Sequence, residues 1–194
     1  MHTNLLPQDG EAYLISDFID PFGASIVYQN LAQEIPWEQE VVIMFGKELR
    51  PQRKVCWMAD KGLNYTYAGK EKQAQTWHSL VHKLKLEIEA LSSAKYNSCL
   101  LNFYPNGEGS MGWHRDNEKE LVPQGSIASL SLGATRKFSF KHIDTKQKVD
   151  LHLASGDLLL MEGLCQEYWY HALPKSKRVN EGRINLTFRQ FIRS

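Results

Sequence analysis

Residues 183–189 read Arg-Ile-Asn-Leu-Thr-Phe-Arg, and this alternation of polar and apolar side chains predicts a β-strand. Successive side chains of a strand point to opposite faces. One face therefore carries the apolar set Ile184, Leu186 and Phe188, and the other carries the polar set Arg183, Asn185, Thr187 and Arg189. The polar set suits an acidic ligand, because a guanidinium group binds a carboxylate through two hydrogen bonds.

The two arginines of this stretch allow more than one arrangement. They could hold both ends of a dicarboxylate, or one could hold the ligand while the other orients a carboxylate that binds a metal. If the polar face binds no ligand, the stretch is instead an edge strand whose polar face is exposed to water.

Short apolar or alternating segments recur between turns throughout the C-terminal half. They are predicted as strands at Cys99–Tyr104, Ile127–Leu132, Lys137–Phe140, Val149–Leu153, Asp157–Met161, Tyr168–Ala172 and Arg183–Phe191. So many short strands predict a β-sandwich or barrel.

The N-terminal half is predicted to combine two helices with further strands. Asp20 is a typical N-cap before Pro21, and this first helix should end before Pro36. A second helix is predicted from Thr76, with an apolar stripe at Trp77, Leu80, Val81, Leu84, Ile88 and Leu91. Further strands are predicted at residues 12–19, 41–45, 55–58 and 63–67. The fold class is therefore mainly β, of the α+β kind.

Length and composition bound the remaining possibilities. The chain has 194 residues, 42% of them hydrophobic, which suits one globular domain and excludes disorder as its main state. The formal net charge of +1 gives no global attraction to nucleic acid. Three cysteines without a metal-type spacing favour a reduced, intracellular protein. No signal peptide and no membrane-spanning segment are expected.

His114-Arg115-Asp116 is the first candidate metal-binding motif. Residues i and i+2 of an extended segment point the same way, so His114 and Asp116 could face one metal, with His171 on a later strand as a third ligand. Two imidazoles and one carboxylate suit Fe(II) in oxygenases, and they also suit zinc.

A second His-x-Asp motif, His142-Ile143-Asp144, runs into the polar segment Thr145-Lys146-Gln147-Lys148. We interpret it as the solvated end of a hairpin rather than as a metal site.

The sequence resembles the AlkB family of Fe(II)- and 2-oxoglutarate-dependent nucleic-acid dealkylating dioxygenases. The resemblance rests on Asn102-Phe103-Tyr104, His114-Arg115-Asp116, His171 and the Arg-x-Asn-x-Thr-x-Arg pattern of 183–189, and it extends through residues 126–134. In the N-terminal half, the segments 45–47, 51–54 and 62–69 resemble the double-strand DNA repair branch.

The resemblance implies a double-stranded β-helix, or jelly roll, with an N-terminal nucleotide-recognition lid and two supporting helices. It implies one catalytic domain over residues 1–194, in which residues 1–96 supply the helices and lid. Residues 97–194 would then form the jelly-roll core with the Fe(II)/2-oxoglutarate site.

The resemblance also assigns roles to individual residues. His114, Asp116 and His171 would be the catalytic iron ligands, and 2-oxoglutarate would be bound by Asn102, Tyr104, Arg183, Asn185, Thr187 and Arg189. Glu118 would lie near the modified base, Tyr65 and Tyr67 would be lid aromatics, Phe45 would intrude into the duplex, and Arg53 would contact substrate.

The implied activity is direct-reversal DNA repair by oxidative demethylation of bases such as 1-methyladenine and 3-methylcytosine. It would consume O2 and 2-oxoglutarate and release succinate, CO2 and formaldehyde. A base inside a duplex must be flipped to reach the metal. An RNA dealkylase on the same scaffold and an inactive nucleic-acid-binding homologue remain alternatives.

Alkylated DNA, single- or double-stranded, is the expected partner, with RNA as a further one. The chain is expected to be a monomer, cytoplasmic in a bacterium and nuclear in a eukaryote. Arg50, Arg53 and Lys54 lie beside the predicted lid, and Lys175, Lys177 and Arg178 follow His171. Both basic groups could contact phosphates or simply form solvated surface.

Overall fold

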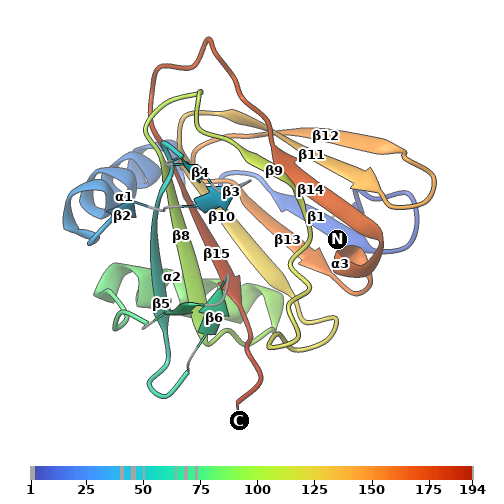
Figure 1. Ribbon diagram of the computed structural model, residues 1–194, viewed down its shortest axis with the longest axis horizontal. Coiled ribbons are helices and arrows are strands. Elements are labelled where there is room, and N and C mark those ends of the chain that lie inside the picture. Colours follow the sequence, from blue (N-terminus) through green and yellow to red (C-terminus); the bar gives the residue numbers. More distant parts are fainter. Residues whose placement is uncertain are drawn as a thin grey trace.

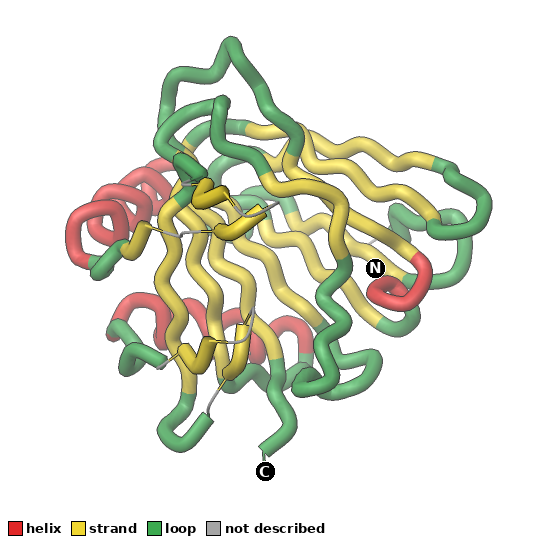
Figure 2. The backbone as a smooth tube through the Cα atoms, in the orientation of Figure 1, coloured by secondary structure: helices red, strands yellow, loops and turns green. Residues whose placement is uncertain are grey.

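The computed structural model describes residues 3–39, 42–44, 47–49, 51–63, 65–67, 70–72 and 74–193. A seven-stranded antiparallel sheet has the order β1 (Glu11–Ile15), β13 (Leu158–Glu162), β10 (Ile127–Gly133), β15 (Arg183–Arg189), β8 (Ser98–Tyr104), β5 (Lys54–Ala59) and β2 (Glu38–Gln39). A four-stranded sheet has the order β12 (Lys148–Leu153), β11 (Arg136–His142), β14 (Trp169–Leu173) and β9 (Met111–His114). The two sheets face each other as Figures 1 and 2 show, and the predicted jelly roll is confirmed.

The larger sheet takes strands from both halves of the chain. β1 and β5 come from the N-terminal half and pair with β13 and β8. Two further hairpins, β3 (Val42–Met44) with β4 (Lys47–Leu49) and β6 (Tyr65–Tyr67) with β7 (Lys70–Lys72), lie outside both sheets.

The strand at residues 183–189 occupies the middle of the larger sheet. β15 pairs with β10 on one side and with β8 on the other, so the edge-strand alternative is wrong. Its apolar residues join a core that also includes residues of the helices α1 (Pro21–Glu34) and α2 (Ser79–Ser92). Its polar residues therefore point to the opposite side, into the space between the sheets.

A second core fills part of that space. It includes Phe138 and Phe140 of β11, Trp169 of β14 and Leu159 of β13. Apolar packing thus holds the two sheets together, and the polar face of β15 lies within the sandwich rather than in water.

The first helix has the boundaries that the sequence predicts. The side chain of Asp20 accepts hydrogen bonds from the backbone N–H groups of Phe22 and Gly23, and Pro21 occupies the first helical position. These contacts satisfy donors that have no partner within the helix.

Several element boundaries differ from the predictions. β1 ends at Ile15 rather than near residue 19, because Asp17 has a φ of 51°, which ends the strand in a turn. The second helix begins at Ser79 rather than at Thr76, because His78 is still extended. A short helix that the sequence did not predict, α3 (Cys165–Tyr168), precedes β14, and β9 forms over the extended segment that carries His114.

His142 is not at a solvated hairpin end, although the hairpin itself between β11 and β12 is present. Its side chain is buried, and its Nε2 lies 3.1 Å from Oδ2 of Asp9. Its Nδ1 accepts hydrogen bonds from the backbone N–H groups of Asp144 and Thr145. The second His-x-Asp motif thus stabilises a turn.

No helix among the described residues is long and apolar enough to cross a membrane.

Candidate metal centre and adjoining cavity

The three predicted metal ligands lie together between the sheets. His114 of β9 and His171 of β14 are direct partners in the strand register, and Asp116 follows β9 by two residues. One donor atom from each residue lies within 4.8 Å of the others, and this is the one such cluster found among the residues that the structure describes. The sequence spacing predicts this grouping, and the strand pairing produces it.

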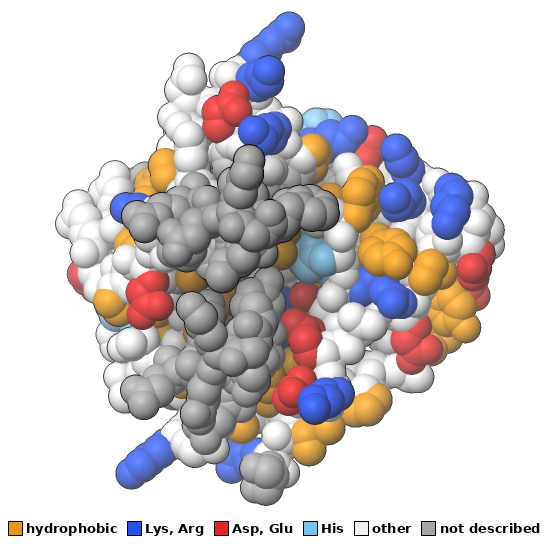
Figure 3. Space-filling model, in the orientation of Figure 1, with side chains coloured by type: hydrophobic (Ala, Val, Ile, Leu, Met, Phe, Trp, Pro, Cys, Tyr) orange, Lys and Arg blue, Asp and Glu red, His pale blue; other side chains and the backbone are white. Residues whose placement is uncertain are grey.

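His114 is oriented by its own strand. Its Nδ1 lies 2.8 Å from the backbone oxygen of Gly112, and a carbonyl can only accept, so Nδ1 carries the proton. Nε2 is then left with its lone pair, the form that binds metals. The side chain of His114 is 30% exposed, so the cluster is reached from solvent on this side. A histidine is visible beside acidic side chains near the middle of Figure 3.

His171 is held in the interior. Its ring stacks on Phe138 with centroids 5.6 Å apart, and burial lowers its pKa to about 3. The imidazole is therefore neutral at physiological pH, as metal binding requires. Its Nδ1 is buried without a hydrogen-bond partner among the described residues, which fits an atom whose partner is a metal.

Asp116 is buried and fixed from two directions. Nη2 of Arg189 donates to Oδ1 of Asp116 at 2.8 Å, and the backbone N–H of Asp116 donates to Oε1 of Gln166 at 2.9 Å. Burial alone would raise its pKa, but Arg189 and the two histidines lower it below the ordinary value. Asp116 is thus an anionic carboxylate of fixed orientation, as a metal ligand requires.

A cavity of about 50 Å³ adjoins the ligands. The six residues predicted to bind 2-oxoglutarate all line it, together with the three predicted metal ligands: Asn102, Tyr104, His114, Asp116, His171, Arg183, Asn185, Thr187 and Arg189. They come from β8, β9, β14 and β15, except Asp116, which follows β9, so the cavity depends on both sheets.

Arg183 supplies a deep positive charge in this cavity. It is 2% exposed, its Nη2 donates to Oγ of Ser131, and its guanidinium lies 5.8 Å from the centroid of Tyr104. Burial lowers its pKa to about 10, so it remains a cation at neutral pH. Its buried Nε has no partner among the described residues, which suits a carboxylate ligand.

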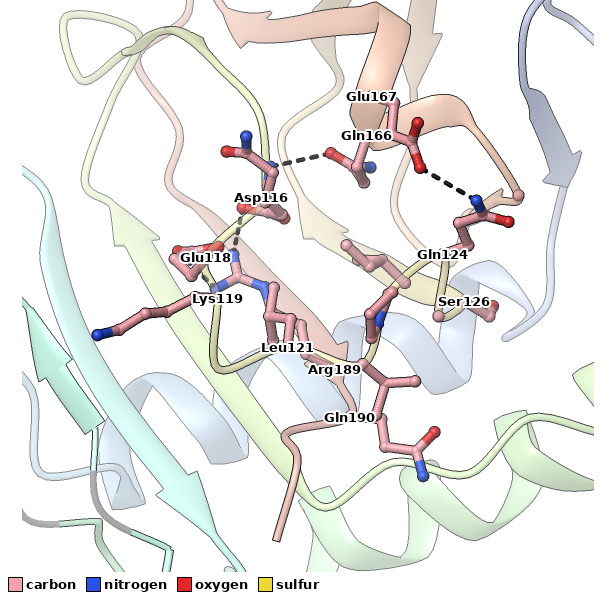
Figure 4. A pocket seen from close by; sticks show the side chains of 16 residues that line it. Asp116, Glu118, Lys119, Leu121, Gln124, Ser126, Gln166, Glu167, Arg189 and Gln190 are labelled. Carbon is pink, nitrogen blue, oxygen red and sulfur yellow. Dashed lines mark hydrogen bonds and ion pairs between the residues drawn. The ribbon is translucent and has the colours of Figure 1, made fainter. Parts of the chain in front are cut away.

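A wider hollow of about 250 Å³ lies on the other side of Asp116 (Figure 4). Glu118 faces it, 4.0 Å from Nη1 of Arg189. Gln166 and Glu167 of α3 form the opposite wall, and Gln124 donates to Glu167 across it. The hollow shares Asp116 and Arg189 with the smaller cavity, so Glu118 borders the candidate metal centre.

The other predicted substrate residues are only partly described. Arg53 is buried rather than part of a basic surface, and its Nη1 donates to Oδ1 of Asn102 inside the smaller cavity. Phe45 and Arg50 lie outside the described residues. Tyr65 and Tyr67 are described only as backbone of β6. In the other basic group, Lys175, Lys177 and Arg178 are exposed on the loop between β14 and β15.

Sequence reasoning missed four residues that shape the site. Ser131 binds Arg183 and Ser129 binds Asn185, and their signal was the alternation of β10 opposite β15. Gln166 gave no local signal, because its contact with Asp116 spans 50 residues. Arg136 is buried and donates to the carbonyl oxygens of Asn106, Gly107, Gly109 and Pro174, which ties together two loops beside the site.

The fold and the site together define an iron- and 2-oxoglutarate-dependent oxygenase. The model of the 2OG-Fe(II) oxygenase superfamily matches residues 11–189. The chain is 35% identical over 180 residues to human DNA oxidative demethylase ALKBH2, covering 87% of this chain and 69% of that protein. It is 35% identical over 186 residues to bovine alpha-ketoglutarate-dependent dioxygenase alkB homolog 3, covering 91% of this chain and 64% of that protein.

The chain belongs to the AlkB family of this superfamily. Its cofactors are accordingly Fe(II) and 2-oxoglutarate. A solved structure, "The structure of OsALKBH1", superposes with a TM-score of 0.65 at 20% identity, covering 92% of this chain and 97% of that one, which supports the fold.

Proposed function

We propose that this protein repairs DNA by oxidative demethylation of N-alkylated bases of the 1-methyladenine and 3-methylcytosine type. The observation that carries the proposal is the 35% identity to a DNA oxidative demethylase, together with a His-Asp-His cluster beside a buried arginine. Bound Fe(II), with 2-oxoglutarate and O2, supplies oxidation of the methyl group, and the hydroxylated product releases formaldehyde.

One set of residues holds the metal, and another set binds the cosubstrate. His114, Asp116 and His171 would hold the metal through two imidazoles and one carboxylate, a ligand set that suits Fe(II). Arg183 binds a carboxylate of 2-oxoglutarate, and Tyr104 packs against the guanidinium. Asn102, Asn185 and Thr187 frame the same ligand from the cavity wall.

Arg189 acts mainly by orienting Asp116, a proposed metal ligand. Its bond to Asp116 supports the second of the two arrangements that the sequence left open, in which one arginine holds the ligand and the other orients a metal-binding carboxylate. It also lines the cavity, so it supports the cosubstrate from the same position.

The substrate base approaches from the exposed side of His114, with Glu118 near the opening. A base methylated at its pairing edge is cationic and poorly paired. It is therefore easier to extrude than a normal base, and a nearby carboxylate favours it.

Mass spectrometry of methylated oligonucleotides tests the proposal. Single-stranded DNA, duplex DNA and RNA carrying 1-methyladenine or 3-methylcytosine are incubated with protein, Fe(II) and 2-oxoglutarate, with His171→Ala as control. Loss of the methyl mass from DNA with matching succinate supports the proposal. Demethylation of RNA alone supports the RNA alternative, and binding without turnover supports the inactive homologue.

A further inference from the structure

The outer face of the four-stranded sheet carries two aromatic rings and two cations beside the metal centre. His114 and His171 point inward, so their neighbours Trp113, Arg115 and Tyr170 point outward. Lys141 joins them because it is the register partner of Tyr170. We call these four residues the Trp113 face.

The cations lie directly against the rings. Nζ of Lys141 lies 4.6 Å from the centroid of the Trp113 ring and 5.9 Å from that of Tyr170. The guanidinium of Arg115 lies 5.1 Å from the Tyr170 centroid. Since β14 separates β9 from β11, Lys141 reaches across Tyr170 to Trp113. Rings and charges are thus presented as one surface.

The Trp113 face is available to a partner. Trp113 is 41% exposed, and in the described part of the chain neither Lys141 nor Arg115 has a carboxylate within ion-pair distance. A hollow of about 190 Å³, lined in part by Trp113, Ser139 and Lys175, lies on the same side. Figure 3 shows basic side chains around hydrophobic ones to the right of the exposed histidine.

This combination matches the chemistry of a nucleic-acid strand. Proteins that hold single strands stack bases on aromatic side chains and place basic side chains along the phosphates. Arg115 donates to the backbone oxygen of Glu167, but neither cation has a carboxylate partner in the described part of the chain, and such cations attract a polyanion. An acidic or apolar protein surface would use only half of the face. β9 is the edge strand of the smaller sheet and its His114 is 30% exposed, so a nucleic-acid strand on this face can pass around the edge to the candidate metal centre.

We infer that the Trp113 face seats the DNA strand next to the target nucleotide, with an unpaired base on the rings and phosphates on Lys141 and Arg115. The inference rests on the proposed function and deepens it. Two contributions to affinity can be separated. Trp113 supplies stacking, whose strength is nearly independent of salt concentration, and Lys141 supplies a phosphate contact, which weakens as the salt concentration rises.

Fluorescence anisotropy with an unmodified single-stranded oligodeoxynucleotide tests the inference. The protein is loaded with Mn²⁺ and the affinity is measured over a range of salt concentrations. Trp113→Ala should weaken binding about tenfold without changing the slope of log affinity against log salt. Trp113→Phe should restore most of the affinity. Lys141→Ala should reduce the slope by about 0.7.

Two variants on the other side of the molecule serve as matched controls. Phe22→Ala removes an aromatic side chain that is 77% exposed on α1, and Lys83→Ala removes an exposed lysine on α2. Both should leave affinity and slope unchanged. Melting temperatures of all variants check that the fold is retained.

The outcomes separate this inference from the proposed function. In one outcome, the wild type demethylates and binds DNA while Trp113→Ala and Lys141→Ala bind with the same affinity and salt dependence. In that case the Trp113 face does not bind the DNA strand, so the inference is wrong and the proposed function stands. If the wild type neither demethylates nor binds any nucleic acid, both are overturned.

Discussion

Arg189 donates a hydrogen bond of 2.8 Å from Nη2 to Oδ1 of Asp116, 73 residues earlier in the chain. Both side chains are buried, so the bond forms in a medium that screens charge weakly. The last residue of β15 thus orients the carboxylate that follows β9. The two ends of the motif thus have different surroundings: Arg189 contacts Asp116, and Arg183 lies buried beside Ser131 and Tyr104.

Replacing any metal ligand should abolish turnover without unfolding the protein. His114→Ala, Asp116→Ala and His171→Ala each remove one donor from the cluster, and all apolar residues of the two hydrophobic cores remain in place. Mn²⁺ binding, followed by the signal of the free ion, should weaken strongly in each, while far-ultraviolet circular dichroism stays unchanged. Normal succinate production by any of the three would refute its assignment as a ligand.

The two arginines of β15 should affect different ligands most strongly. Removing one partner of a buried charge pair costs about 3–5 kcal/mol. Arg183→Met should therefore raise the dissociation constant of 2-oxoglutarate far more than that of Mn²⁺. Arg189→Met should weaken both, because it releases Asp116 as well. Isothermal titration with each ligand separates the effects, and equal Mn²⁺ affinity in the two variants would contradict this division.

Gln166 should position Asp116 without touching the metal. Gln166→Leu leaves the backbone N–H of Asp116 buried without its acceptor, and such supporting contacts are worth about tenfold to a hundredfold in metal affinity. Gln124→Leu is a matched control, because it removes only an exposed contact to Glu167. Mn²⁺ titration and melting temperature are measured for both. A loss of stability with unchanged Mn²⁺ affinity would leave Gln166 a purely structural role.

Glu89 gives a pH-dependent contribution to stability far from the site. Burial raises its pKa, but the N–H of Tyr96 and the charges of Lys85 and Lys95 outweigh burial and lower the pKa below its ordinary value of 4.5. A carboxyl group whose pKa is lower in the folded state stabilises the fold when the pH is above its unfolded-state pKa. This stabilisation is lost as the pH falls through the folded-state pKa.

Glu89→Gln should therefore be less stable than the wild type by about 1–2 kcal/mol at neutral pH. The difference in free energy of unfolding should shrink as the pH falls from about 5 toward 3, because the wild-type carboxylate then takes up a proton. Urea unfolding of both proteins at several pH values measures this difference in free energy of unfolding. A difference that stays constant over this range would show that the charge of Glu89 does not contribute.

Phe45 should act on duplexes and not on single strands. The resemblance that identifies it as an intruding residue implies that it fills the gap left by a flipped base, and a single strand has no such gap. Phe45→Ala should lower activity on methylated duplex DNA by about tenfold, which corresponds to about 1.4 kcal/mol. Rates on single-stranded and duplex oligonucleotides are compared. An equal loss on both would assign Phe45 a structural role.

The sequence by itself determined the main strands of the C-terminal half, the two faces of the strand at residues 183–189 and the spacing of two candidate metal ligands. Alternation over residues 183–189 fixed which side chains share a face, and the spacing of His114 and Asp116 put two ligands on one side of an extended segment. Asp20 and Pro21 fixed the start of α1. These are local properties, because the period of a strand and the capping of a helix depend only on neighbouring residues.

The tertiary structure decided which faces meet. Only the sheet order places β15 between β8 and β10, buries Arg183 against Ser131 and brings Arg189 to Asp116. Only the packing of α3 against the chain after β9 makes Gln166 a support for Asp116, and only the fold buries His142 and Arg53. These contacts join residues about 50 or more positions apart, and the contact of His142 with Asp9 spans 133. They depend on which strands pair and which surfaces pack, and no local periodicity carries that information.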